Sequence, residues 1–314
     1  MKRVLKFLSI IFSLAEFIFA GSALYAQTMP IYSFQQFSNI NFNPASIPVK
    51  DYVEGTLISR HQWAGFKGSP KSQMLNFQGY VREIKSSFAT TVQSEFFGPT
   101  YQLNFKGIYA YNFEIGTQYY LTLGLGAGLI YRYFDGSQII TEDEDDPAVI
   151  RDVVNDVKPD FDFGLVLSAK AFTIGLSATH LTSFLYQKNK QFFTPNWGIH
   201  AFAQYDFEIA EKHHIIPYIR AYYEGTVFQA EIQLRADLFD IFWLGAGYRF
   251  QDGLVFNCGF RIAKMVGIGY AYDFNLGSNK ASLKNKGTHE IILHLRINSY
   301  KNMGESSENP RYFE

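Results

Sequence analysis

The stretch RHQWAGFKGSPKSQ, residues 60–73, holds two glycines, a proline and two lysines, which are residue types of a phosphate-binding loop. A P-loop also needs a Gly-Lys-Ser/Thr ending and a following helix, and this stretch has neither. We therefore predict a hairpin, in which Trp63 ends one strand and Pro70 rigidifies the return. Gly65 and Gly68 would supply the positive φ angles of the turn.

A second glycine-rich stretch, GLGAG at residues 124–128, superficially matches a dinucleotide-binding fingerprint. That fingerprint requires a strand, then a glycine turn that opens a helix. Here the glycines lie inside a segment of alternating polarity, all on its less apolar face. We predict no cofactor, and expect these glycines to make room in a lumen or to allow strand curvature.

Some outer-membrane barrels are hydrolases with a serine, a histidine and an amide or acid at the rim. Candidates for such a group are Ser168, Ser177, His180, Asp160 and Asp162, which lie on neighbouring predicted strands. These residues differ in the strand face to which they point and in their position along the strands, so their side chains do not meet at one point. The sequence therefore predicts no catalytic group, and we expect a protein that is not an enzyme.

The remaining metal-ligating and nucleophilic residues give no site either. His213 and His214 are adjacent, so in a strand they point to opposite faces. Cys258, the single cysteine, alternates with apolar residues and reads as a small apolar side chain. One cysteine also excludes a disulfide framework, and we predict no metal site.

The elements that carry these residues are long strands. In residues 119–133, Tyr119, Leu125 and Tyr131 belong to an apolar face that is aliphatic in its middle and aromatic at its ends, while the glycines fall on the other face. Twelve steps at roughly 3.3 Å extend about 40 Å. Tilted by about 40°, such a strand spans roughly 30 Å, close to the apolar band of an outer-membrane barrel with its aromatic girdles.

Similar alternation predicts thirteen strands, at residues 52–63, 73–82, 101–115, 119–133, 160–169, 171–180, 196–209, 214–224, 226–238, 241–250, 254–263, 265–276 and 288–298. The fold class is then all-β: a transmembrane up-and-down antiparallel β-barrel of about fourteen strands, of the bacterial outer-membrane type. Long connections at 83–99, 135–159, 181–195 and 277–287 all fall on one side. Such connections lie outside in outer-membrane barrels, which would put the turn 60–73 on the periplasmic side.

The chain divides into four predicted regions. Residues 1–26 have the basic start, apolar run and small residues of a secretory signal peptide, or of an uncleaved anchor. Residues 27–50 form either the missing first strand or a plug in the lumen. The barrel occupies 51–298, with an acidic outer loop at 141–160, and 299–314 form a polar tail. The formal net charge of −1 gives no reason to expect nucleic acid as a partner.

Three stretches together resemble the PorP/SprF family of outer-membrane proteins of the type IX secretion system. The first joins an Asn-Pro-Ala element to a Gln-Trp, Gly-Phe-x-Gly-x-Pro-x-Ser turn, with the matching residues Asn43, Pro44, Ala45, Gln62, Trp63, Gly65, Phe66, Gly68, Pro70 and Ser72. The others are FTIGLSATHL (172–181) and the closing strands, which include GTHEIILHLRI (287–297). Ser72 stands where the family more often has threonine.

The resemblance implies a non-enzymatic barrel in the bacterial outer membrane, in contact with its lipid. In gliding-type machinery, some relatives help a secreted, motile surface adhesin to reach the cell surface or stay on it. Others link the periplasmic ring of the secretion machinery to the outer membrane. A passive channel for small solutes is the rival interpretation. The turn residues Trp63, Gly65, Phe66, Lys67, Gly68, Pro70 and Lys71 are a candidate docking site for a periplasmic partner, or only set the strand register.

Overall fold

The computed structural model describes residues 30–139, 151–186, 193–250, 252–276 and 286–298, so the predicted signal peptide and polar tail lie outside the described residues. The strands are β1 (Tyr52–His61), β2 (Lys71–Val81), β3 (Ser86–Phe97), β4 (Thr100–Ile115), β5 (Tyr119–Asp135), β6 (Val153–Ser168), β7 (Phe172–Thr179), β8 (Gly198–Tyr205), β9 (Phe207–Ala210), β10 (His213–Glu224), β11 (Val227–Leu238), β12 (Phe242–Arg249), β13 (Gly253–Ile262), β14 (Val266–Asn275) and β15 (Thr288–Asn298). Among the described residues, no helix is long and apolar enough to cross a membrane.

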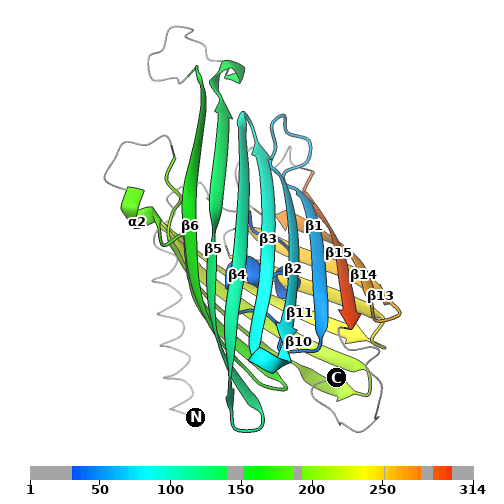
Figure 1. Cartoon of the computed structure of the whole chain (residues 1–314). Helices are drawn as coiled ribbons and strands as arrows, with labels where there is room; N and C mark the ends of the chain where they lie inside the picture. The colour runs from blue at the N-terminus through cyan, green and yellow to red at the C-terminus, as the bar shows by residue number, and fades with distance from the viewer. Residues whose placement is uncertain (1–29, 140–150, 187–192, 251, 277–285, 299–314) are drawn as a thin grey trace, which may run out of the picture.

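All the strands belong to one antiparallel sheet that closes on itself (Figure 1). β8 and β9 both pair with β10 and are one strand interrupted at Asp206, so the fifteen labelled strands make a barrel of fourteen. Closure is made by β1 and β15, which pair in register from Tyr52↔Asn298 to His61↔His289. Closure removes the free sheet edges that a hydrocarbon environment does not tolerate. The predicted fold class is confirmed.

The fourteenth strand is not where the strand count placed it. Residues 83–99, predicted to be a long connection, contain β3, which pairs with β2 and β4 along its whole length. The outward face of β3 carries serine, threonine and valine between Phe88 and Phe96, a pattern too weakly apolar to stand out in the sequence. The described part of the N-terminal segment contains no strand, so the first-strand alternative is wrong.

β6 also begins earlier than predicted. The stretch 151–160 was assigned to an acidic outer loop, but β6 pairs with β5 from Val153 onward. Val153 and Val157 point outward, while Lys158 points into the barrel, so the alternation continues into this stretch. β-branched residues favour strands, which explains the extension. Residues 140–150, the rest of the loop, lie outside the described part of the chain.

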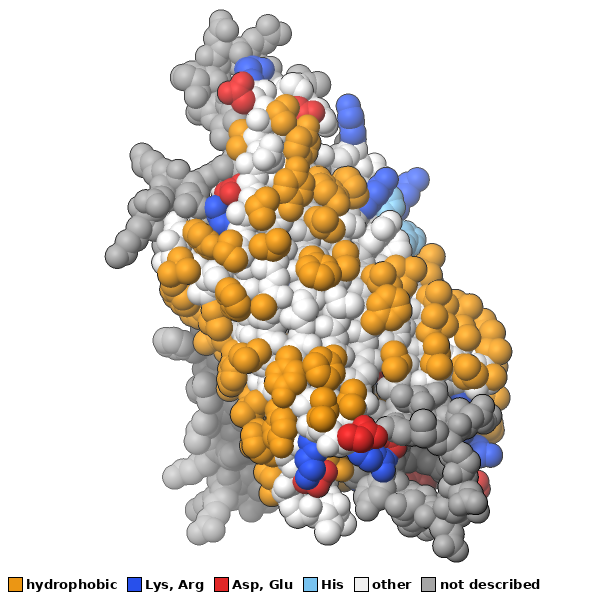
Figure 2. Space-filling view, viewed as in Figure 1, with side chains coloured by type: hydrophobic (Ala, Val, Ile, Leu, Met, Phe, Trp, Pro, Cys, Tyr) orange, Lys and Arg blue, Asp and Glu red, His pale blue; other side chains and the backbone are white. Residues whose placement is uncertain are grey.

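The two faces of the wall differ in polarity as predicted. Outward side chains such as Leu125, Leu129 and Ile219 are each more than half exposed. Figure 2 shows hydrophobic side chains over this outer surface, with charged groups gathered near the two ends. Cys258 is also exposed on the outer face. Inward side chains are largely polar, and they include Asn104, Asp160 and Arg220.

Adding β3 reverses the predicted orientation of the hairpin 60–73. The connections at 82–85, 116–118, 169–171, 211–212, 239–241 and 263–265 all lie at one end, the short-turn end. The opposite end, the long-connection end at the top of Figure 1, carries 62–70, 136–152, 180–197 and 276–287. Backbone hydrogen bonds join Ala64 to Gly287 and Gly68 to Gly98 at this end. The prediction that this turn lies at the end opposite the long connections is wrong. Since long connections face outward in outer-membrane barrels, we expect the turn at the outer end.

We expect cysteine labelling to verify this orientation. In a Cys258→Ala background, Lys67→Cys should react with a polyethylene-glycol maleimide on intact cells, because the turn 62–70 faces outward. Lys170→Cys, at the short-turn end, should react only after the outer membrane is permeabilised. The reverse pattern would contradict the assigned orientation.

Candidate functional site

The lumen of the barrel is occupied by the chain's own N-terminal segment. Residues 30–51, here called the lumen segment, run inside the wall and carry two short 3-10 turns, η1 (Gln35–Phe37) and η2 (Asn39–Asn41) (Figure 1). Most of its side chains are buried, and Tyr32, Asn43 and Ala45 have no exposed surface. Because these residues touch inward side chains from both walls, they are the core of the molecule.

One wall holds the segment through a buried ionic site near the long-connection end. Arg60 of β1 donates from Nη1 to Glu290 of β15 at 3.0 Å and from Nη2 to Asp273 of β14 at 2.8 Å. The backbone N–H groups of Ser33 and Phe34 donate to the Glu290 carboxylate at 2.9–3.0 Å. A single carboxylate therefore binds both the barrel's arginine and the lumen segment.

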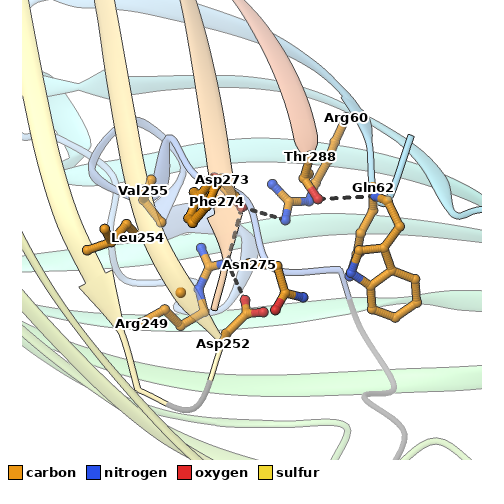
Figure 3. Close-up of a pocket in the computed structure, with 12 residues that line it drawn as sticks. Arg60, Gln62, Arg249, Asp252, Leu254, Val255, Asp273, Phe274, Asn275 and Thr288 are labelled. Atoms are coloured by element: carbon orange, nitrogen blue, oxygen red, sulfur yellow. Dashed lines mark hydrogen bonds and ion pairs between the residues drawn. The ribbon is translucent and has the colours of Figure 1, made fainter. Parts of the chain in front are cut away.

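The ionic site extends along the wall to β11 and β12. Arg249 donates to Glu231 of β11 at 2.9 Å. It also donates to Asp252 at 2.9 Å and to Asp273 at 3.2 Å (Figure 3). Gln233 donates to the carbonyl of Ser33 at 3.1 Å. Burying charges is costly unless they are paired and hydrogen-bonded, and this network pairs both arginines.

The space between these groups is too small for a solute. A cavity of about 10 Å³ lies among Arg60, Arg249 and Asp273 (Figure 3). Such a volume holds about one water molecule. Arg60 Nε and Arg249 Nη2 are buried without a protein partner, so a single water is the occupant that this cavity suits.

Apolar residues complete this wall where a water-filled lumen would carry polar ones. Tyr32 and Phe34 of the lumen segment pack in one cluster with inward side chains from five strands: Ile58, Met74, Trp243, Ala271 and Ile292. Each of these wall residues is at most 1% exposed. The barrel wall is thus complementary to the segment in polarity as well as in charge.

The opposite wall receives the Asn-Pro-Ala element in a recess made by glycines. A Cβ atom on Gly124 of β5 would lie 2.4 Å from Ala45 N and Pro44 C, and one on Gly164 of β6 would lie 2.2 Å from Asn43 Oδ1. Both distances are far below van der Waals contact, so these positions require glycine. The prediction that Gly124 makes room in the lumen is confirmed.

Hydrogen bonds fix this element in its recess. Asn43 Nδ2 donates to the carbonyls of Leu165 at 3.3 Å and Leu176 at 3.2 Å, and its Oδ1 accepts from Ala45 N at 2.9 Å. Ser177 Oγ donates to the carbonyl of Phe42 at 2.7 Å. The asparagine side chain therefore joins the segment to β6 and β7.

Phe42, next to this element, is held by a cation and aromatic rings. The guanidinium of Arg220 lies 3.9 Å from the centre of its ring, and Phe202 packs edge-on at 5.8 Å. Tyr218 donates to Asn39 Oδ1 at 2.9 Å. Such a cation–π contact is strongest where water is excluded, as it is here.

The residues considered for hydrolysis meet only in part. His180 Nδ1 lies 2.9 Å from Asp160, and the backbone N–H of His180 donates to Asp162 Oδ1 at 2.9 Å. The Lys106 ammonium, 2.8 Å from Asp160, contacts both carboxylates and occupies the position a metal ion would take between them. Ser177 is engaged with Phe42, so it is not available to His180 as a nucleophile.

Ser168 lies near the short-turn end of β6, where it pairs with Tyr120 and Thr173, away from His180. The candidate docking turn is exposed, with Trp63 at 40% and Phe66 at 37%. Gly65 and Gly68 have φ angles of 102° and 76°, which agrees with the predicted hairpin chemistry.

The sequence analysis did not predict the ionic site. Strand alternation assigns Arg60, Arg249 and Glu290 to the polar inner face but does not say what they bind. The signal that was available is the concentration of charge at inward positions close to one end of β1, β12, β14 and β15. A water-filled pore would not need such buried pairs.

A pair of glycine variants should test the recess. Gly124→Ala should lower the free energy of unfolding by roughly 1–3 kcal/mol, because backbone atoms of the lumen segment fill the space. Gly126→Ala, in the same strand and on the same face, meets its nearest atom at 3.4 Å and is the matched control. Urea titration in lipid vesicles measures both, and equal effects would contradict the recess.

Solved structures of outer-membrane proteins resemble the fold at very low sequence identity. A deletion mutant of TodX, a monoaromatic hydrocarbon channel, is 10% identical with a TM-score of 0.50, and the match covers 82% of this chain and 93% of that one. Omp33 of Acinetobacter baumannii also matches, with 9% identity and a TM-score of 0.45, over 80% of this chain and 99% of that one. A FadL homologue of Pseudomonas aeruginosa matches with 10% identity and a TM-score of 0.45, over 87% of this chain and 95% of that one. No relative was found among curated proteins.

The model of the family "Type IX secretion system membrane protein PorP/SprF" matches residues 24–295. This range contains the lumen segment, the recess that holds Asn43, and almost all of the barrel. The chain is therefore a bacterial outer-membrane β-barrel that belongs to the PorP/SprF family of type IX secretion system membrane proteins.

Proposed function

We propose that this barrel is a non-enzymatic scaffold or anchor for type IX secretion, with no open path for solutes through its lumen. Membership of the family supports a role in secretion. The observation that carries the rest of the proposal is the filled lumen, since the segment contacts both walls through the ionic site and the recess. A barrel closed in this way offers its two ends, rather than its interior, for function.

The absence of catalysis is part of the same proposal. Among the described residues, the one cluster of a histidine with two carboxylates is bridged by the Lys106 ammonium, and the nearby serine binds Phe42. The cluster joins β4, β6 and the end of β7 within the wall, and the serine holds the lumen segment. This supports a structural role for His180, Asp160 and Asp162.

The two ends would serve different partners. The short turns and the start of β1 at Tyr52 lie at the periplasmic end, where components of the secretion machinery would bind. The turn 60–73 lies at the outer end, so as a docking site it would serve a secreted surface adhesin instead. Trp63 and Phe66 are its exposed aromatic groups.

Deletion of the gene tests the proposed role in secretion. We expect one or more secreted proteins to disappear from the cell surface, and the gene supplied in trans to restore them. Quantitative proteomics of the surface and the medium measures this. An unchanged surface proteome and secretome would contradict the proposal.

A passive channel for small solutes is the second candidate, favoured by the polar inner face of the strands. Purified protein in planar lipid bilayers separates the two. The scaffold proposal expects no steady conductance, because the lumen segment is bound on both walls. A large steady conductance from the intact protein would support the channel.

A further inference from the structure

Three basic side chains stand side by side on the outer surface at the long-connection end. His289 of β15 pairs with His61 of β1, and His61 pairs with Lys71 of β2. Directly paired residues in an antiparallel sheet share a face, with Cβ atoms about 5 Å apart. Lys67 adds a further charge in the adjoining turn 62–70. Figure 2 shows Lys, Arg and His side chains at the upper right of the molecule.

A hollow opens at this row, and its lining combines a lysine and an imidazole with apolar side chains. Its volume is about 310 Å³, and it lies between the turn 62–70 and the end of β3. His61 and Lys71 line it on one side, and Phe66 and Phe96 supply apolar surface. His61 Nε2 lies 3.0 Å from Ser69 Oγ, which holds the imidazole at the edge of the hollow.

The positive charge at this hollow is unbalanced within the protein. In the part of the chain that the structure describes, neither Lys67 nor Lys71 forms an ion pair. At the short-turn end the contrast is clear, because exposed Lys85 pairs with Glu114 at 3.1 Å and Lys264 with Asp240 at 3.2 Å. Lysines without an acidic partner attract anions.

The depth of the hollow in the membrane indicates which anion. Lys71 of β2 pairs with Phe96 of β3, and Phe96 pairs with Tyr101 of β4. The ring centres of Phe96 and Tyr101 lie 4.6 Å apart on the outer surface. Such aromatic residues lie at the membrane interface in outer-membrane barrels. The basic row is thus level with the lipid headgroups, and Phe96, at 54% exposed, faces the acyl chains.

We propose that this hollow binds the phosphate-bearing headgroup of a lipid in the outer leaflet of the outer membrane. The phosphate contacts Lys71 and His61, with Lys67 closing over it from the turn. An acyl chain of the same lipid lies against Phe96. The lipid joins the turn 62–70 to the membrane surface.

Native mass spectrometry of the purified full-length protein tests this, with diphosphoryl lipid A as the probe. We expect diphosphoryl lipid A to remain bound, dephosphorylated lipid A to bind much more weakly, and inorganic phosphate not to displace the lipid. Equal retention of the two lipids would overturn the proposal, since the phosphate would then contribute nothing. Displacement by inorganic phosphate would assign the hollow to a free anion instead.

The matched variants are Lys71→Gln and Lys170→Gln. Lys71→Gln should weaken retention of diphosphoryl lipid A about fivefold, the effect of one basic residue near an anionic surface. Lys170→Gln, an exposed lysine at the short-turn end, should leave it unchanged. Heat-dependent mobility on gels checks that both barrels are folded. Wild-type lipid retention by Lys71→Gln, with loss of a secreted surface protein from pull-downs, would assign the turn to a protein partner and overturn the lipid proposal.

Discussion

The interior of this protein depends on one buried arginine. Arg60 is 3% exposed and lies between Glu290 and Asp273, so removing it would leave two buried carboxylates without their main counter-charge. Breaking buried pairs of this kind typically costs about 3–5 kcal/mol. The same carboxylates accept hydrogen bonds from Ser33 and Phe34, so the arginine that neutralises the wall also prepares it to bind the lumen segment.

The opposite wall contributes space rather than charge. Gly124 and Gly164 have no room for a side chain, because Asn43, Pro44 and Ala45 occupy it. With one end of the segment bound ionically and the other seated in a glycine recess, the chain between them crosses the lumen. The filled lumen supports our proposal that the barrel does not conduct solutes, and this is why we propose that its function lies at the two ends.

The sequence predicted the barrel, its apolar outer face and its closing strands, because period-2 alternation is strong in segments such as 119–133. It did not predict β3, whose outward face has serine, threonine and valine between Phe88 and Phe96. This one missing strand placed the hairpin 60–73 at the wrong end of the barrel. The ionic site could not be predicted from the sequence for a different reason. Ser33 and Glu290 are 257 residues apart, and no local spacing connects them. The sequence predicted that the glycines at 124–128 make room in the lumen. It did not predict that the Asn-Pro-Ala element fills the space at Gly124.

Hydrogen–deuterium exchange of the intact protein in lipid tests the filled lumen most directly. If residues 30–51 are held as described, the amides of Ser33, Phe34 and Ala45 will exchange as slowly as those of the neighbouring strands, because each donates to a buried acceptor. A segment outside the lumen would exchange its amides within seconds, as an unfolded tail does. Fast exchange throughout residues 30–51, with protected strands, would contradict the central claim.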